Sequence, residues 1–287
     1  MRRRDFLKQQ LATTCLLSFG ASAFVRTEAS ETDRTGFTPI FDGKTLNGWI
    51  AKPRNPNMSN STGRWVVEDG AIIGGQEPPG SGIGAYLVSE EKYGDFELLV
   101  DAKPDWSVDT GILVRTNDAG RVGHQMLLDH RRSGGIGGFY GNGLKNYHAI
   151  CSSFDAKYDE NGNPIGLQLD TSTAAVEWIT EAKRNLPIYY IPADEFLKVW
   201  KWNDWNTFKI RCVGKYPHLT SWVNGVKICE LDTATMQWAG YDKEETFKLL
   251  GSDGHISFEV HDNKPEDDWR WAKGKVCRWK NIYVKKL

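Results

Sequence analysis

The residues best suited to acid–base chemistry lie on one face of a predicted strand near the end of the sequence. Over residues 255–261, three apolar side chains alternate with Ser257, Glu259 and His261. Successive side chains of a strand point to opposite faces, so Glu259 and His261 should share a face. A carboxylate beside an imidazole can take up and release protons near neutral pH. This face is the first candidate for a catalytic surface.

Two earlier segments offer partners for that face. In 110–115, Arg115 falls opposite the apolar residues, although it can equally pair with a surface carboxylate. The segment GHQMLLD over 123–129 supplies His124, Gln125 and Asp129, and its faces are ambiguous because both carry apolar residues. If these strands are neighbours in one sheet, five residues converge on one surface: Arg115, His124, Asp129, Glu259 and His261.

Other candidates would bind a ligand rather than react with it. His130 fits a binding role and an ordinary loop equally well. The glycine-rich stretch 134–138 is expected to be a flexible loop leading into a strand, and no helix follows it as a phosphate cradle requires. Tyr140, just after it, can offer a hydroxyl to a sugar. Trp269 and Trp271 lie in a polar loop and can act as platforms for sugar rings.

The elements that must position these residues are short strands. Apolar-alternating runs are separated by Gly, Pro, Asn and Asp, and Asn224-Gly225 favours a tight hairpin. The predicted strands are 64–68, 71–74, 85–89, 96–102, 110–115, 124–129, 207–213, 219–223, 226–231, 255–261 and 276–284. This spacing predicts an all-β sandwich. The irregular segment 151–202, with a predicted helix over 173–185, is expected to be a partly helical insertion.

The first residues predict export. Arg3 and Arg4 precede Phe-Leu-Lys, an interrupted apolar stretch over 11–25 and the small residues 21–23. This pattern is typical of a removable twin-arginine signal, and the stretch is too short for a permanent membrane anchor. We therefore expect residues 1–34 to be a signal peptide with a polar spacer, residues 35–287 to be one β-sandwich domain, and the mature protein to be periplasmic or secreted.

The amino-acid composition narrows the classes of molecule that the protein could bind. Lys and Arg number 36 against 37 Asp and Glu, so no overall charge attracts nucleic acid. The 12 tryptophans fill a β core or stack on sugar faces, and composition alone does not separate these roles. None of the cysteines outside the signal, Cys151, Cys212, Cys229 and Cys277, has CxxC metal spacing. Cys212 alternates with apolar residues and is expected to be a buried thiol, although a disulfide is compatible with export.

Six strings in order carry a family resemblance. They are FTPIFDGKTLNGW (37–49), GAYLVSEEKYGDFEL (84–98), DTGILVR (109–115), WNTFKI (205–210), WVNGV (222–226) and RWKNIYV (278–284). Together they resemble the 3-keto-disaccharide hydrolase domain family, from about residue 37 to 287 apart from the insertion. The resemblance implies a concanavalin-like jelly roll of two antiparallel sheets, one of them concave and carrying the site.

The resemblance also implies a chemistry. A ketone at C3 of a glycoside acidifies the C2 proton, so a base can remove it while an acid assists departure of the C1 oxygen. Within the family pattern Asp129 and His261 are retained, whereas Glu259 replaces an amide and His124, or Gln125 if the register slips by one, stands where a Glu is usual. The implied roles are His261 or Asp129 as base and His124 as acid. Arg115, or a divalent cation held by Asp129, Glu259 and His261, would stabilise the enolate.

Alternatives remain at this point. Retaining glucanases on such sheets carry two or three closely spaced carboxylates on one strand, and the nearest string, 91–97, does not match. A non-catalytic carbohydrate-binding module would use the same concave face and its tryptophans. A hydratase or lyase would act on a sugar that is already unsaturated. The leading interpretation is a glycoside-processing enzyme for 3-keto-disaccharides and related 3-keto-glycosides, working downstream of a sugar 3-oxidoreductase.

Overall fold

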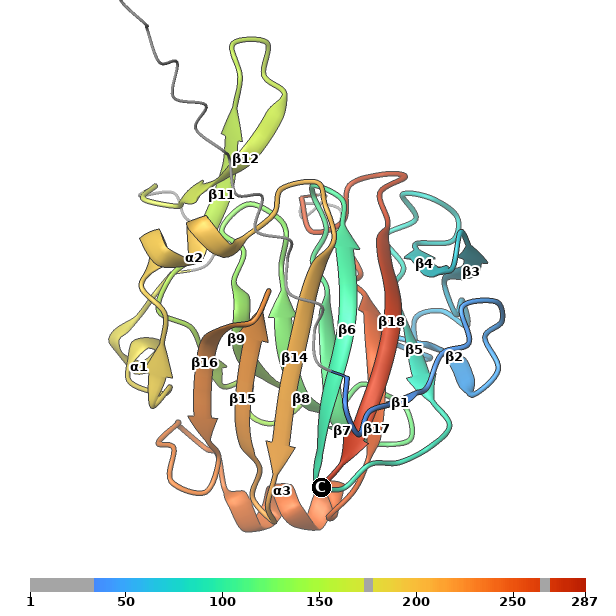
Figure 1. The fold of residues 1–287 in the computed structure, drawn as a ribbon, viewed down its shortest axis with the longest axis vertical. Coiled ribbons are helices and arrows are strands. Elements are labelled where there is room, and N and C mark those ends of the chain that lie inside the picture. Colours follow the sequence, from blue (N-terminus) through green and yellow to red (C-terminus); the bar gives the residue numbers. More distant parts are fainter. Residues whose placement is uncertain (1–33, 173–177, 264–268) are drawn as a thin grey trace, which may run out of the picture. The chain divides into compact units, whose positions relative to one another are not determined.

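Two antiparallel sheets face each other across one apolar core (Figure 1). The structure is a computed structural model that describes residues 34–172, 178–263 and 269–287. The predicted signal peptide, residues 1–33, therefore lies outside the described residues, as do 173–177 and 264–268. The predicted all-β sandwich with a partly helical insertion is confirmed.

The first sheet has nine strands. Its order is β13-β16-β15-β14-β6-β18-β4-β3, with β1 paired to β18. The strands are β1 (Thr38–Pro39), β3 (Arg64–Glu68), β4 (Ala71–Gly75), β6 (Phe96–Pro104), β13 (Tyr189–Tyr190), β14 (Asn206–Val213), β15 (His218–Val223), β16 (Val226–Asp232) and β18 (Cys277–Lys286). The Asn224-Gly225 turn joins β15 to β16, with both residues at positive φ, as the hairpin prediction requires.

The second sheet has seven strands in the order β10-β9-β8-β7-β17-β5-β2. They are β2 (Trp49–Pro53), β5 (Ala85–Ser89), β7 (Gly111–Thr116), β8 (Gly123–Leu128), β9 (Ile136–Asn142), β10 (His148–Ala149) and β17 (His255–Val260). This sheet brings together β7, β8 and β17, the three strands whose polar residues the sequence singled out. They are adjacent in the sheet, which is the condition under which the sequence placed their polar residues on one surface.

Alternation along these strands sorts the two faces. Phe258 of β17 stacks in the core between Trp49 and Trp279, with ring centroids 5.1 and 5.0 Å away. Burial of large aromatic rings is a main stabilising term of such a core. Because Phe258 points inward, Glu259 must point to the outer face of the seven-stranded sheet. The outer face therefore receives the polar residues of β17.

The insertion contains a projecting hairpin and two short helices (Figure 1). The hairpin is formed by β11 (Phe154–Tyr158) and β12 (Pro164–Leu169), and the helices are α1 (Glu181–Arg184) and α2 (Ala193–Val199). Phe154 stacks on Phe196 at 4.7 Å, which attaches the base of the hairpin to α2. Residues 173–177 of the predicted helix 173–185 lie outside the described residues, and of the part 178–185 only α1 is helical.

Several elements are absent from the predicted set, including strands β1, β2 and β10 and helix α3 (Lys243–Leu250). This helix begins at Asp242, whose carboxylate caps the Glu245 N–H. The glycine-rich stretch was predicted to be a flexible loop leading into a strand; the strand is β9, but it begins at Ile136, so most of the stretch is strand rather than loop. A Cβ on Gly141 would lie 2.3 Å from the Tyr147 ring, so glycine here allows close packing.

Two further properties bear on the sequence predictions. All four cysteines of the described chain are free, and Cys212 is a buried thiol as expected. Burial raises the pKa of Cys212 to about 12, so this thiol stays protonated. Within the described residues, helices are too short or too polar to cross a bilayer.

Candidate active site

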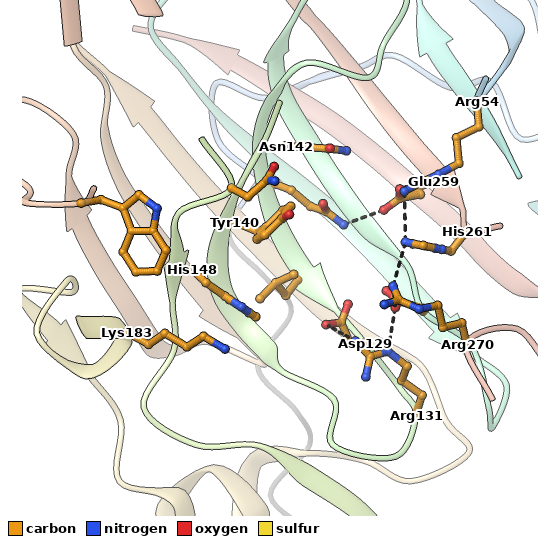
Figure 2. Close-up of a pocket in the computed structure, with 15 residues that line it drawn as sticks. Arg54, Asp129, Arg131, Tyr140, Asn142, His148, Lys183, Glu259, His261 and Arg270 are labelled. Atoms are coloured by element: carbon orange, nitrogen blue, oxygen red, sulfur yellow. Dashed lines mark hydrogen bonds and ion pairs between the residues drawn. The ribbon is translucent and has the colours of Figure 1, made fainter. Parts of the chain in front are cut away.

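A cavity of about 320 Å³ lies over the outer face of the seven-stranded sheet (Figure 2). That volume is at the lower end of the range for small-molecule sites. Its walls come from β8, β9, β10 and β17, from the segments that follow β2 and β17, and from the insertion. The lining residues are Arg54, Asp109, Gln125, Leu127, Asp129, Arg131, Tyr140, Asn142, Asn146, His148, Lys183, Trp238, Glu259, His261 and Arg270.

Glu259 is buried in the floor of the cavity and bonded through both oxygens. Its Oε1 forms an ion pair with Arg54 and accepts a hydrogen bond of 3.0 Å from the Tyr86 hydroxyl. Its Oε2 accepts a hydrogen bond of 2.6 Å from Gln125 Nε2. Gly111 on β7 makes this possible, because a Cβ there would lie 2.2 Å from Gln125 Nε2. The Glu259 carboxylate is therefore fixed in place by its neighbours.

His261 lies between two arginines, which determines its tautomer. Its Nδ1 is 2.6 Å from the Asp262 carbonyl oxygen and 2.9 Å from the Asp262 carboxylate, so Nδ1 donates. Its Nε2 is 3.0 Å from Arg54 Nη2 and 3.3 Å from Arg270 Nη1. A guanidinium can only donate, so Nε2 must accept. His261 thus carries its proton on Nδ1 and presents a lone pair at Nε2.

Asp262 supports that tautomer. Partial burial favours its neutral form, but the hydrogen bond from His261 and the charge of Arg54 outweigh burial and hold the pKa of Asp262 well below its usual value. Arg54 Nε lies 3.1 Å from the same carboxylate. The Asp262 carboxylate therefore fixes the orientation of the His261 ring, with Nδ1–H donating to Asp262 and Nε2 directed at Arg54 and Arg270.

A second charged group lines the cavity beside His261. Arg131 Nε donates to Asp109 Oδ2 at 2.7 Å, and Arg131 Nη2 lies 3.5 Å from Asp129 Oδ2. Burial opposes ionisation of Asp109, yet Arg131, His261 and Arg270 together hold the pKa of this carboxyl well below its usual value. The three side chains of Asp109, Asp129 and Arg131 are each at most 6% exposed. Asp109 is therefore a permanent anion here.

The remainder of the wall is amide, aromatic and cationic. Tyr140 and Asn142 project from β9, and His148 of β10 stands edge-on to Tyr140 at 5.4 Å. Asn142 Nδ2 donates to the Tyr86 hydroxyl at 3.1 Å, which ties this wall to the Glu259 group. Lys183 reaches the cavity from α1 of the insertion, and Trp238 reaches it from the segment after β16.

The family model of the 3-keto-alpha-glucoside-1,2-lyase-like domain matches residues 36–285. The chain belongs to this family. A curated 3-keto-disaccharide hydrolase of Bacteroides thetaiotaomicron is 38% identical over 86 residues, which are 28% of this chain and 27% of that protein. The matched segment thus spans about a quarter of the relative's length. The family predicted from the six sequence strings is confirmed.

Two solved structures are similar to this chain at low sequence identity. A candidate glycosyl hydrolase from Parabacteroides distasonis is 17% identical, with a TM-score of 0.47 over 88% of this chain and 94% of that one. The carbohydrate-binding module CBM66 from Bacillus subtilis is 10% identical, with a TM-score of 0.44 over 83% of this chain and 96% of that one.

The cavity brings together five of the residues selected from the sequence. Glu259 and His261 share the outer face, as alternation predicted. The ambiguity of β8 is resolved by Met126 and Leu128, which enter the core and leave Gln125 on the outer face with Asp129 after it. The five selected residues that line the cavity are Gln125, Asp129, Tyr140, Glu259 and His261.

His124 and Arg115 do not join this surface, so the expected convergence is wrong for both. His124 points into the sandwich, where its Nδ1 lies 2.7 Å from the Tyr147 hydroxyl, and burial lowers its pKa to about 3. Arg115 has a φ of 47° at a register shift between β7 and β17. Its guanidinium binds the carbonyl of Gly94 and the carboxylate of Asp95. Neither residue can serve as acid or enolate stabiliser in the cavity.

His130, Trp269 and Trp271 lie away from the cavity walls. His130 packs in the core among tryptophans, 4.8 Å from the Trp202 ring, and burial lowers its pKa to about 4. Trp271 is 1% exposed and donates to the Lys275 carbonyl. The expected sugar contacts of His130 and Trp271 are therefore wrong.

Trp269 instead supports cavity residues. The guanidinium carbons of Arg131 and Arg270 lie 4.8 and 4.9 Å from its ring centroid. Cation–π contacts of this kind hold arginines in fixed positions. Its ring contacts two arginines of the cavity wall, so Trp269 supports those arginines and does not itself line the cavity.

The metal set expected from the sequence does not fit the geometry. Asp129, Glu259 and His261 each contact an arginine, and both Glu259 oxygens already accept hydrogen bonds. A divalent cation at this point would face three guanidinium groups, which repel it. Among the described residues, no group of three or more His, Cys, Asp or Glu side chains is placed to hold a metal ion.

The sequence pattern did not single out the arginines of the site. Arg54, Arg131 and Arg270 follow strands or lie in loops, where alternation was not applied. Asp109 was also missed, although it has the same parity as Leu113, which lies on the outer face. Continuing the alternation of β7 two residues upstream of Gly111 would have placed Asp109 on the outer face.

Proposed function

We propose that this chain cleaves 3-keto-glycosides by removing the C2 proton, with His261 as the base. The observation that carries the proposal is the position of His261 Nε2 at the cavity wall, with Arg54 Nη2 at 3.0 Å and Arg270 Nη1 at 3.3 Å. A proton acceptor between two fixed cations is the arrangement that enolate formation needs.

In the first step the C2–H bond breaks. The proton moves to His261 Nε2, and the electron pair of the bond forms the C2–C3 double bond while negative charge develops on the C3 oxygen. Once Nε2 has taken the proton it can no longer accept a hydrogen bond, so the Nη2–H of Arg54 and the Nη1–H of Arg270 are released to that oxygen, while Arg54 stays bound to Glu259 and Asp262. As His261 becomes positively charged, its Nδ1–H remains on Asp262, which stabilises the imidazolium.

In the second step the enolate expels the leaving group. The C3 carbonyl re-forms, the double bond moves to C1–C2, and the C1–O bond breaks. The departing oxygen takes one proton, for which the Tyr140 hydroxyl is the candidate donor in the wall. The products are a 3-keto sugar unsaturated between C1 and C2 and a free alcohol. Addition of water across that double bond completes a net hydrolysis.

The carboxylates of the cavity argue against hydrolysis by two carboxyl groups. That mechanism needs one protonated carboxyl and one free nucleophile or base. Glu259 has both oxygens engaged by Arg54, Tyr86 and Gln125. The low pKa of Asp109 keeps it from donating a proton. These groups instead orient the arginines that surround His261.

The test uses a 4-nitrophenyl 3-keto-glucoside and the variant His261→Gln. Loss of the base should lower kcat/KM by about 100-fold or more. His218→Gln is the matched control, because His218 is 44% exposed and pairs with Glu230 on the other sheet. Nitrophenol release in D₂O should also leave deuterium at C2 of the hydrated sugar product. Turnover with retention of the original C2 hydrogen would refute proton abstraction. Binding without turnover would identify a carbohydrate-binding module.

The substrate chemistry implies a supplier. A ketone at C3 must arise by oxidation of the C3 alcohol of a glycoside, so we propose that a sugar 3-oxidoreductase acts first. We also propose export by the twin-arginine route, supported by Arg3, Arg4 and the apolar stretch that follows. Periplasmic or secreted 3-keto-glycosides would then be the substrates.

A further inference from the structure

The cavity has two chemically different halves (Figure 2). Glu259, His261 and Arg270 lie on one side of the close-up, and His148 and Lys183 lie on the other. The first half holds the charged network around His261. The second half is built from β9, β10, the insertion and Trp238, and its groups bind rather than transfer protons from carbon.

The span of the cavity exceeds one sugar ring. Tyr140 lies on β9 and Glu259 on β17, and β8 and β7 separate these strands. Three strand spacings of about 4.8 Å each give a distance of about 14 Å. Two pyranose rings in line fill such a length, whereas one ring leaves a half of it empty. If the keto sugar binds at His261, the other half is available for the group that leaves from C1.

Trp238 gives that second half an aromatic wall. Its indole Nε1 donates to the Lys145 carbonyl at 3.0 Å, so the polar tip of the ring is satisfied within the protein. The neighbouring loop holds Lys145 and Asn146 at φ of 58° and 52°, which places Asn146 at the cavity. A tryptophan with its N–H bonded elsewhere offers carbon surface to the C–H groups of a sugar or to an aromatic ring.

We propose that this half is a leaving-group subsite, in which Trp238 packs against a glycosyl or aryl group attached at C1. The inference rests on the proposed function, because it assigns a place to the group expelled by the enolate. Asn146, His148 and Lys183 line the same cavity and offer hydrogen-bonding groups, as a hydroxyl-rich leaving sugar requires. The preferred substrates are then 3-keto-disaccharides and aryl 3-keto-glycosides rather than simple alkyl ones.

The test compares two substrates in Trp238→Ala. On a 3-keto-disaccharide kcat/KM should fall about tenfold or more, while on methyl 3-keto-glucoside it should change less than about twofold, since the methyl group does not reach the subsite. Trp238→Phe keeps an aromatic face and should retain most of the disaccharide activity. Trp222→Ala, on β15 of the other sheet, is the control for loss of a partly buried tryptophan. Thermal melting verifies that each variant is folded.

The outcomes separate the two proposals. Equal losses on both substrates, or no loss on either, would overturn the leaving-group subsite. If Trp238→Ala does not fold, Trp238→Leu takes its place as the variant without an aromatic ring. Its loss of kcat/KM on the 3-keto-disaccharide, relative to its loss on methyl 3-keto-glucoside, is then compared with that of Trp238→Phe. A wild-type protein that turns over neither substrate would refute the proposed function itself, and the subsite would fall with it.

Discussion

Arg54 Nη2 lies 3.0 Å from His261 Nε2, and the same guanidinium forms an ion pair with the buried carboxylate of Glu259. Its Nε atom also lies 3.1 Å from Asp262. One arginine thus contacts the candidate base, the carboxylate that orients that base and the anion of the cavity floor. A planar fork with fixed donors can serve these partners at once.

Replacing Arg54 by Lys should therefore lower activity despite keeping the charge. A lysine ammonium cannot reproduce the fork, so it can serve Glu259 or His261 but not both. We expect kcat/KM on a 3-keto-glucoside to fall about 100-fold or more, mainly through kcat, because enolate stabilisation is lost. Arg64→Lys is the control, since Arg64 forms an exposed pair with Glu68. An Arg54→Lys enzyme of normal kcat would contradict this role.

Gly111→Ala tests whether Gln125 must lie over β7 to reach Glu259. The added Cβ would lie 2.2 Å from Gln125 Nε2, so the amide must move and Glu259 loses a hydrogen bond. Overpacking and the lost bond should lower the free energy of unfolding by about 1–3 kcal/mol, measured by urea denaturation.

The double variant Gly111→Ala with Gln125→Ala separates the two causes. Removing the Gln125 side chain relieves the clash, so part of the free energy of unfolding should return. The hydrogen bond to Glu259 is still missing, so kcat/KM on a 3-keto-glucoside should stay below that of the parent. Gly166→Ala on β12 is the control, because a Cβ there meets no atom within 4 Å. Full stability of Gly111→Ala alone would show that Gln125 has room to move.

Much of the fold could be predicted because alternation and turn chemistry act locally. The alternation in 255–261 correctly predicted that Glu259 and His261 lie on the outer face, because its apolar residues define one inward face without ambiguity. The hairpin at Asn224-Gly225 followed from the low cost of positive φ. The start of strand β9 within the glycine-rich stretch could not be predicted in this way. Its glycines are required by neighbours such as Tyr147, which the sequence alone does not place against them.

The candidate site could be predicted only in part, for two physical reasons. His124 shares its parity with Met126 and Leu128. Because those two side chains point into the core, the His124 imidazole points there as well. Arg115 had the parity of the outer face, but its positive φ at a register shift redirects the side chain. Arg54 comes from a segment 207 residues from His261, and only the fold brings the two together. Contacts of that range are set by sheet order rather than by local pattern.

The buried His124 predicts a loss of stability in acid. Burial, with a smaller contribution from Arg115, lowers its pKa to about 3, against 6.5 in the unfolded chain. Between these values the unfolded chain binds a proton that the folded chain does not, so stability falls as the pH drops from about 6.5 towards 3. The slope from this group approaches about 1.4 kcal/mol per pH unit.

His124→Gln should flatten that dependence, because glutamine cannot titrate. Urea unfolding at pH 7 and pH 4.5 should show a difference smaller by about 2 kcal/mol than in the parent protein. His130, whose pKa is about 4, contributes with the same sign in both proteins and cancels in the comparison. His218→Gln, at an exposed site, should leave the parent's slope in place. Equal slopes in His124→Gln and the parent would show that His124 titrates normally.

The export proposal has a separate test that needs no substrate. In the double variant Arg3→Lys with Arg4→Lys the charge of the leader is kept, but the paired guanidinium groups are lost. If the pair is what the twin-arginine route recognises, the variant should stay in the cytoplasmic fraction at full length, while the parent is exported and shortened near residues 21–23. Arg2→Lys leaves the pair intact and should be exported like the parent. Export of the double variant at the parent's level would show that another route carries the chain.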